Sequence, residues 1–599
     1  MSPNPDAGGN GSHERRTRAT IADLVLTPYY YLLYGIVLLA ATLLALKPLG
    51  EHLIGDATIF CLVVANQTGF NVAPYYDISA AVVDFGHPLL YVGILMATGW
   101  LFGPSLLSFR LFGVACLVVD LVLIRKIADQ MTSSTREARL VSLLASTLFL
   151  LMPYAIDGSL HIDIDTSVLP VICLAFTLTF ALFVRSTGRR RMTLGCAVSL
   201  LFSLGLWAKL TTPLLLPLAA FGYCLCTKQK LRTLLLHAML FVIGAGVFMG
   251  TWHLLCTACN FPTLSVFRRI LSVFASKVGG PSLDVSELGR TIVVISFAFN
   301  PLLMVVWLLA LGDVMRRIVS HKPNNDVTLY LAILTPAICL GYCMIGRLTY
   351  GVPKYHLPFA PLAALLAASF LGPVLARLSI RKFALGAVAG ILSGLLFAFI
   401  PDPLYVVNHE LKAAAFSGRS FTPSLVLLSI AAVAYFASLG IAIVLWITGR
   451  KNVAWEILMF SILMQLVGYN LRQSLAPYQI AYSYGVRGIP EAFRRISDCQ
   501  RFFVPEATII APTRYSIADT VDNLARMPAE SGSDATKATF WRAYLLTYRP
   551  EAVVCGPAFN TVSQLKTIFL TPGFESIVGA YYERVQYWDA TVYLRKPVE

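Results

Sequence analysis

The sequence predicts a polytopic α-helical membrane protein with about thirteen transmembrane helices and a small C-terminal α/β domain on the outer face. Of its 599 residues, 57% are hydrophobic and only 13% are charged, and the mean hydropathy is +0.70. A soluble domain is about a quarter charged. Short basic clusters separate long apolar segments, and charged residues return together with short strand-like runs beyond residue 471.

The net charge of +15 could by itself indicate a nucleic-acid-binding protein. Most Lys and Arg, however, stand in short runs between apolar segments, where they orient transmembrane helices instead of forming one basic face. We therefore expect no nucleic-acid partner.

Residues 1–26 are polar, Gly-rich and then basic, and no small-residue cleavage site follows them, so we expect a disordered cytosolic tail before a retained first helix.

The distribution of basic clusters predicts which apolar segments cross the membrane. If every cluster is cytoplasmic, an even number of spans must separate neighbouring clusters. Three apolar segments lie between the first two clusters, so one of them does not cross. The weakest candidate is residues 86–103, "GHPLLYVGILMATGWLFG", because its apolar part at 88–102 has only about 15 residues and a bilayer core requires about 20. We expect this segment to lie along the outer interface.

The transmembrane module is then expected over residues 27–471, with a long first outer loop at 48–105. Its expected spans are 27–47, 106–124, 140–156, 167–184, 193–208, 210–226, 233–252, 290–311, 328–346, 357–376, 383–400, 422–447 and 453–470. The odd number of spans leaves the C-terminus outside. Residues 472–599 carry the strand-like runs "ATIIAP", "EAVVCG" and "ATVYLR" between helix-like segments, which predicts an α/β domain on the outer face.

This topology places the long loops, and therefore the candidate functional residues, on the outer face. In the first outer loop, Asp56 precedes an amphipathic run, where the dipole of an interfacial helix would favour a functional carboxylate. The alternative is a plain N-cap, for which Asp is a preferred residue. Glu51 is a further acid, which we expect to be solvated.

The second outer loop, "YAIDGSLHIDIDTSV", places Asp157, His161, Asp163 and Asp165 within nine residues. Carboxylates and a histidine this close together suit a divalent metal ion or the positioning of sugar hydroxyls. The alternative is a solvated loop in which Asp165 or Thr166 caps the next helix.

Two further outer regions are cationic. Lys209, in "LGLWAKLTTP", lies at a turn between two apolar segments and either binds an anion or snorkels at the membrane edge. Arg347, Lys354 and Tyr355 stand in a basic and aromatic loop before a span. That composition suits a lipid phosphate, although aromatic belts with snorkelling lysines occur at any membrane interface.

Taken together, several of these segments resemble the GT-C class of polyprenyl-phosphate-sugar glycosyltransferases. They are the carboxylate of the long first loop, "GHPLLYVGILMATGWLFGPSLLSFRLFGVACLVVDLVLIRKIA", the acidic second loop, "GLWAKLTTPLLLP" and "PKYHLPFAPLAALLAA". By pattern the sequence is most similar to the protein O-mannosyltransferase and lipid A aminoarabinose transferase group, over most of residues 27–380. The resemblance implies thirteen spans, interfacial helices in the first loop and often an outer C-terminal domain. Ala57 and Leu89 depart from the family pattern, so the resemblance does not define the subfamily.

The resemblance implies that Asp56 occupies the catalytic acidic position and that "HPLL" begins an interfacial helix. Such an enzyme transfers a hexosyl or pentosyl group, with inversion, from a polyprenyl-phosphate donor to a protein, lipid or glycan on the outer face. Because phosphate is a competent leaving group, one general base is sufficient, and Asp56 is the candidate. The candidates for the donor phosphate are Lys209, Arg347, Lys354 and Tyr355, and those for positioning substrate are His87, Asp163 and Asp165.

Metal dependence stays open at this point: the second loop permits a weak divalent cation site at Asp157, His161 and Asp163, whereas the resemblance does not imply a catalytic metal or another cofactor. Two alternatives stay open: an oligosaccharide ligase or polymerase of the same fold class, and a transporter or lipid flippase. No internal repeat is visible and acidic residues are scarce in the expected spans, which argues against the transporter. We expect a bacterial inner membrane location with the N-terminus in the cytoplasm.

Overall fold

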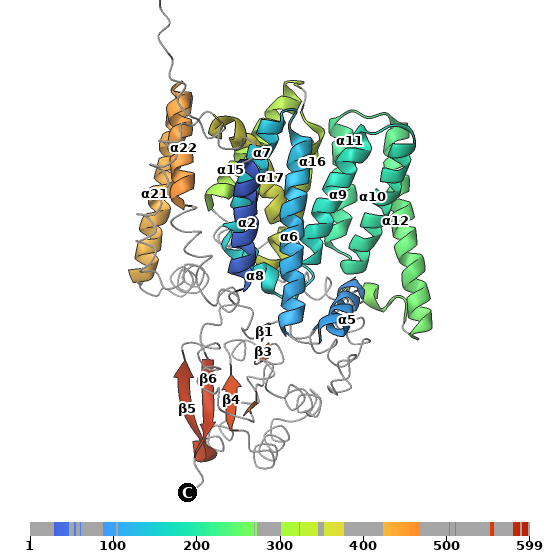
Figure 1. Ribbon diagram of the computed structural model, residues 1–599, viewed down its shortest axis with the longest axis vertical. Helices are drawn as coiled ribbons and strands as arrows, with labels where there is room; N and C mark the ends of the chain where they lie inside the picture. Colours follow the sequence, from blue (N-terminus) through green and yellow to red (C-terminus); the bar gives the residue numbers. More distant parts are fainter. Residues whose placement is uncertain are drawn as a thin grey trace, which may run out of the picture.

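The computed structural model combines a bundle of long helices with a small β-sheet at one end (Figure 1). It describes residues 29–46, 53–54, 60, 88–103, 106–260, 262–268, 270–271, 301–322, 324–344, 353–376, 388, 423–465, 502–503, 509–510, 551–555, 579–587 and 590–596.

Every expected span except 383–400 overlaps a described helix, and 383–400 lies outside the described residues apart from Val388. The α-helices are α2 (Tyr29–Leu46), α5 (Leu90–Phe102), α6 (Leu106–Met131), α7 (Thr135–Leu150), α8 (Pro153–Leu160), α9 (Val168–Arg185), α10 (Gly188–Ala208), α11 (Leu215–Cys226), α12 (Leu231–Ala258), α15 (Pro301–Val319), α16 (Asp326–Met344), α17 (Ala360–Leu375), α21 (Pro423–Ile447) and α22 (Lys451–Gln465). Two 3₁₀ helices are η2 (Thr212–Leu214) and η3 (Pro353–Phe359).

Within the described ranges, 5 helices are long and apolar enough to cross a membrane. They comprise α6, α9, α10, α12 and the segment Lys354–Pro373, which joins η3 to most of α17. The chain is therefore a multi-pass membrane protein, as its composition predicts.

The centre of the bundle is α17, which packs against α7 and α15. Its residues from Ala360 to Ala368 include five alanines and three leucines, and each of these side chains is fully buried. Small side chains let neighbouring helices approach closely, and the dispersion attraction between closely packed helices stabilises them in a lipid solvent. The segment that begins at Lys354 is therefore held rigidly by the bundle core.

One end of the bundle, here called the basic end, gathers the ends of several helices that carry cationic residues. Arg185 at the end of α9 contacts Asp326 and Asn325 at the start of α16, and it also donates a 2.9 Å hydrogen bond to the carbonyl of Gln130 near the end of α6. Arg125 of α6 and Arg139 of α7 lie over the ring of Tyr30, next to the start of α2. The clustering of these positively charged helix ends is the pattern expected of a cytoplasmic face.

The opposite end, here called the site end, carries α5, α8 and the β-strands (Figure 1). Helix α5 has 13 residues, so it is about 20 Å long and too short for a hydrocarbon core of about 30 Å. Its Tyr91 and Leu95 are buried, while Trp100 and Phe102 at its far end are 69% and 75% exposed. The helix ends where Gly103 adopts φ 82°, a left-handed conformation that glycine tolerates without strain. These features agree with the interfacial position expected for residues 86–103.

The C-terminal sheet has the strand order β2-β4-β6-β5. Its strands are β2 (Phe502–Phe503), β4 (Ala552–Cys555), β5 (Tyr582–Tyr587) and β6 (Ala590–Arg595). The β2–β4 pair is parallel and the other two pairs are antiparallel. A separate antiparallel pair joins β1 (Leu53–Ile54) of the first loop to β3 (Ile509–Ile510), so the two regions expected on the outer face are in contact.

Candidate functional site

Residues 161–167 of the second outer loop are folded into the protein and do not form the solvated loop of the alternative interpretation. His161, Asp163, Asp165 and Thr166 are each only 3 to 4% exposed. The carboxylate of Asp163 accepts the main-chain N–H of Asp165 at 2.9 Å, and the Ser167 hydroxyl donates to the carbonyl of Asp163 at 2.6 Å. These local bonds close a compact turn. Neither Asp165 nor Thr166 caps α9, whose N-cap is Ser167 without a side-chain cap hydrogen bond.

A close approach between α6 and α8 places this loop. A Cβ added at Gly113 of α6 would lie 1.8 Å from the main-chain oxygen of Ser159, which stands in α8 just before the loop. No side chain fits at that distance, so α8 can pack in this position only because residue 113 is glycine. Helix α8 also contacts η3, which carries Lys354.

Two buried lysines are paired with the two aspartates of the loop. The Nζ of Lys209 lies 2.5 and 2.7 Å from the two carboxylate oxygens of Asp165. The Nζ of Lys354 lies 2.7 Å from Oδ2 of Asp163. The side chains of Lys354 and Asp163 are 4% and 5% exposed, and those of Lys209 and Asp165 are 10% and 4% exposed. Lys209 therefore does not snorkel, because a snorkelling lysine keeps its charged group in water.

The ring of Tyr355 joins the two ion pairs. The Nζ atoms of Lys209 and Lys354 lie 4.7 and 4.9 Å from its centroid, on the scale of cation–π contacts. Tyr355 in turn stacks on Tyr342 at a centroid distance of 5.9 Å, and the Tyr342 and Thr212 hydroxyls are hydrogen-bonded to each other. Residues from α16, η2, η3 and two loops thus converge on one cluster.

The ion pairs place both lysines against carboxylates in a buried site. Burial by itself lowers the pKa of Lys209, but the Asp165 carboxylate together with the Tyr342 and Tyr355 hydroxyls outweighs this effect and raises that pKa above its ordinary value. An unpaired buried ammonium would cost several kcal/mol, so the aspartates are needed to maintain positive charge here. The resulting cluster carries two fixed ammonium groups, each with three N–H donors, beside an aromatic ring.

Tyr342 and Thr212 were not among the residues expected from the sequence. Tyr342 stands in the apolar run of α16, where an aromatic residue is ordinary, and no spacing connects it with Lys209. Thr212 follows Lys209 by three positions in "AKLTTP", which is the one local signal that could have indicated it.

Several expected site residues lie outside the described part of the chain: Asp56, His87 and Arg347, together with the side chain of Asp157. The described residues on either side of Asp56 are Ile54, which belongs to β1, and Phe60, whose ring lies 5.1 Å from that of Tyr91 in α5. Among the described residues, no group of three or more His, Cys, Asp or Glu side chains gathers as it would around a metal ion. Instead, Asp163, which was a candidate ligand, contacts Lys354.

The structure is similar to the crystal structure of ArnT from Cupriavidus metallidurans bound to undecaprenyl phosphate. The TM-score is 0.57 and the sequence identity is 14%, over 95% of this chain and 99% of that chain. The apo state of the same ArnT gives a TM-score of 0.54 with the same identity and coverage. A more distant match is the archaeal oligosaccharyltransferase AglB from Archaeoglobus fulgidus, in complex with an inhibitory peptide and a dolichol-phosphate. Its TM-score is only 0.40 and its sequence identity is 12%, over 94% of this chain and 74% of that chain.

No family model matches the sequence, and no curated protein matches it. The fold class is nevertheless shown by the structural similarity: the chain has the GT-C fold. In particular it has the fold of ArnT, a lipid A aminoarabinose transferase, along nearly its whole length. The structure thus confirms the resemblance that the sequence motifs indicated.

Proposed function

We propose that this protein is a membrane glycosyltransferase that moves a hexosyl or pentosyl group from a polyprenyl-phosphate donor to a protein, lipid or glycan acceptor on the outer face of the membrane. The observation that carries the proposal is the pair of buried lysines beside Tyr355, at the site end of a chain with the fold of ArnT. The solved ArnT structure holds undecaprenyl phosphate, which is a ligand of the proposed donor class.

In this proposal the lysines bind the donor phosphate. Each ammonium has three N–H donors, and the Asp163–Lys354 and Asp165–Lys209 pairs hold both ammonium groups beside the ring of Tyr355. Fixed positive charge in a buried site stabilises the charge that develops on the phosphate as it leaves. Tyr355 and Arg347 are proposed to bind the same phosphate, and the polyprenyl chain to lie against apolar helix faces.

Asp163 and Asp165 are proposed to position the donor through the lysines. Their carboxylates hold the two ammonium groups about equally far from the ring of Tyr355. His87 is proposed to position substrate at the start of α5. A divalent cation is not needed for this arrangement, and we propose transfer without a metal.

The proposed reaction is one displacement at the anomeric carbon. Asp56 accepts the proton of the acceptor hydroxyl, whose oxygen forms the new bond to that carbon. The bond between the carbon and the phosphate oxygen breaks, and its electron pair leaves with the polyprenyl phosphate. Attack opposite the leaving group inverts the anomeric configuration.

The test is transfer from a panel of radiolabelled polyprenyl-phosphate monosaccharides by the purified full-length protein with host membrane extract. We expect one donor to give labelled product with inverted configuration. No transfer from any donor by folded protein, or label moving only as a whole glycan, would contradict the proposal. Transport of labelled lipid across vesicles without bond cleavage would also contradict it, in favour of a flippase.

A second experiment tests the phosphate site. Lys354→Ala should weaken binding of polyprenyl phosphate about tenfold or more, which corresponds to the loss of a hydrogen bond to a charged group. Arg317→Ala is the matched control, because it removes an exposed cation paired with Asp313 at the basic end. Equal affinities of the two variants would show that Lys354 does not contact the phosphate.

The orientation is proposed from the positions of the cationic helix ends. The basic end would face the cytoplasm, and α5, the Lys–Asp pairs and the C-terminal sheet would face the periplasm of a bacterial inner membrane. A cysteine-accessibility experiment with a reagent that does not cross membranes tests this orientation.

A further inference from the structure

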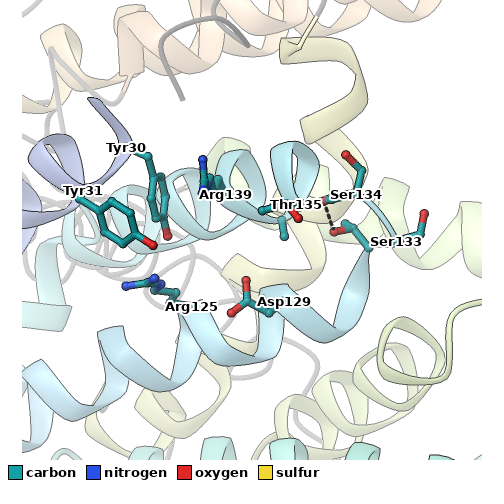
Figure 2. Close-up of a pocket in the computed structure, with 10 residues that line it drawn as sticks. Tyr30, Tyr31, Arg125, Asp129, Ser133, Ser134, Thr135 and Arg139 are labelled. Carbon is teal, nitrogen blue, oxygen red and sulfur yellow. Dashed lines mark hydrogen bonds between the residues drawn. The ribbon is translucent and has the colours of Figure 1, made fainter. Parts of the chain in front are cut away.

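A polar cavity lies at the basic end, at the opposite end of the bundle from the Lys–Asp pairs. It has a volume of about 350 Å³, within the range of small-ligand pockets, and lies between α2, α6 and α7 (Figure 2). Its lining includes two arginines, two tyrosines, one aspartate and a run of hydroxyl residues from Thr132 to Thr135. The proposed transferase mechanism makes no use of it.

The tyrosines of α2 hold the two guanidinium groups in place. The Cζ atom of Arg125 lies 5.4, 5.2 and 5.7 Å from the ring centroids of Tyr30, Tyr31 and Tyr34. That of Arg139 lies 5.4 and 5.8 Å from the centroids of Tyr30 and Tyr31. Aromatic stacking fixes the Arg125 guanidinium without using its N–H donors, which is the arrangement that favours recognition of a phosphate.

A carboxylate in the same cavity is not paired with Arg125. Asp129 stands one helical turn after Arg125 in α6, a spacing at which an ion pair is common. Within the described part of the chain, however, neither Arg125 nor Asp129 forms a hydrogen bond or ion pair. Figure 2 shows the Arg125 guanidinium extending toward Tyr31 and away from the Asp129 carboxylate. The cavity therefore presents separate positive and negative groups to a ligand.

The surface next to the cavity is apolar. On α2, Leu32, Ile36, Leu39 and Leu43 are 53 to 63% exposed and share one helix face, which begins beside Tyr31. In a membrane this exposed apolar face contacts acyl chains, because the lipid tails form the apolar environment around the bundle. A ligand with its polar group in the cavity can thus lay its apolar part along α2.

We infer that this cavity binds the headgroup of a phospholipid that carries both a phosphate and a primary amine, as phosphatidylethanolamine does. The phosphate contacts Arg125 and Arg139, the ammonium contacts Asp129, and the acyl chains lie against α2. A purely anionic headgroup would place negative charge beside Asp129, and a quaternary amine would lack N–H donors for that carboxylate. The site is independent of the proposed donor site.

The test is native mass spectrometry of the delipidated full-length protein in detergent, titrated separately with dioleoyl phosphatidylethanolamine, phosphatidylglycerol and phosphatidylcholine. We expect tightest binding of phosphatidylethanolamine. Arg125→Gln should weaken its binding about tenfold or more, whereas Lys126→Gln should not, because Lys126 is exposed in α6 and does not line the cavity. Asp129→Asn should remove the preference over phosphatidylglycerol while binding persists.

Three results would overturn the inference. Equal or tighter binding of phosphatidylglycerol by the wild type would indicate a general attraction to anionic lipid at the basic end. Displacement of the lipid by soluble phosphoethanolamine at equal concentration would indicate a site for a free phosphorylated amine. Equal losses in Arg125→Gln and Lys126→Gln would exclude this cavity. If Arg125→Gln does not fold, the change of lipid preference in Asp129→Asn decides, because that variant keeps the shape of the side chain.

Discussion

Replacement of Lys354 by Met should lower the free energy of unfolding by about 3 to 5 kcal/mol, the range observed when one partner of a buried ion pair is removed. The Nζ atom of Lys354 lies 2.7 Å from Asp163, and both side chains are at most 5% exposed. Methionine matches the length of lysine and leaves little cavity, so the cost arises from the Asp163 carboxylate, which loses its cation in a buried site.

The chain contains a matched control for this experiment. The Arg317–Asp313 contact at the basic end is almost equally short, 2.8 Å, but the Arg317 side chain is 49% exposed. Arg317→Met should therefore cost less than about 1 kcal/mol. Because the two contact distances are nearly equal, the difference between the variants measures the effect of burial together with that of Arg316, which keeps Asp313 paired at 2.6 Å when Arg317 is replaced.

Reversible SDS-induced unfolding followed by circular dichroism provides the free energies, and Asp163→Asn completes a double-mutant cycle. Asparagine keeps the oxygen that accepts the N–H of Asp165, so the double variant Asp163→Asn/Lys354→Met should recover at least half of the loss. Equal effects of Lys354→Met and Arg317→Met would refute the assignment of a desolvated ion pair. A double variant Asp163→Asn/Lys354→Met that recovers none of the lost stability would also refute this assignment.

Further predictions concern the loop, the charge of the site and the metal. Gly113→Ala should displace α8 and lower the thermal denaturation midpoint, because the added Cβ would meet the Ser159 oxygen. The control Gly250→Ala, which has open space around it, should be neutral or stabilising. Equal midpoints of the two variants would contradict the close packing of α6 and α8. Donor affinity, measured by titration, should not fall between about pH 6 and pH 9 because of Lys209. The neighbouring Asp165 raises the pKa of Lys209, and the lysine loses its charge only when the pH rises through that raised pKa. A decrease that Lys209→Gln abolishes would contradict this sign. Transfer should persist in excess EDTA, and its loss with recovery on adding Mg²⁺ or Mn²⁺ would establish a metal requirement.

The fold could be predicted largely from sequence because length and charge act locally along the chain. The short apolar part of residues 86–103 indicated a non-crossing helix, and α5, with 13 residues, is also too short to cross and lies at the end of the bundle. The three expected strands correspond to β3, β4 and β6. Strand β5, "YERVQY", was missed, because Glu583, Arg584 and Gln586 are exposed and the strand lacks an apolar run.

The site could be predicted only in part. The sequence indicated Lys209, Lys354, Asp163 and Asp165 as separate candidates, each with a structural alternative. Their pairing joins positions 44 and 191 residues apart, and no local pattern encodes it. It depends on the way α8 packs against α6 and η3, which is a property of the assembled bundle. Asp56, the proposed base, lies outside the described residues and stays a prediction.

We propose that this chain transfers a sugar with a carboxylate of the first loop as general base. The most direct measurement compares label transfer from the best polyprenyl-phosphate sugar by wild type, Asp56→Asn and Glu51→Gln, all purified and matched for donor binding. We expect transfer by wild type and Glu51→Gln, and none above background by Asp56→Asn with donor affinity unchanged. Near-normal transfer by Asp56→Asn would contradict it.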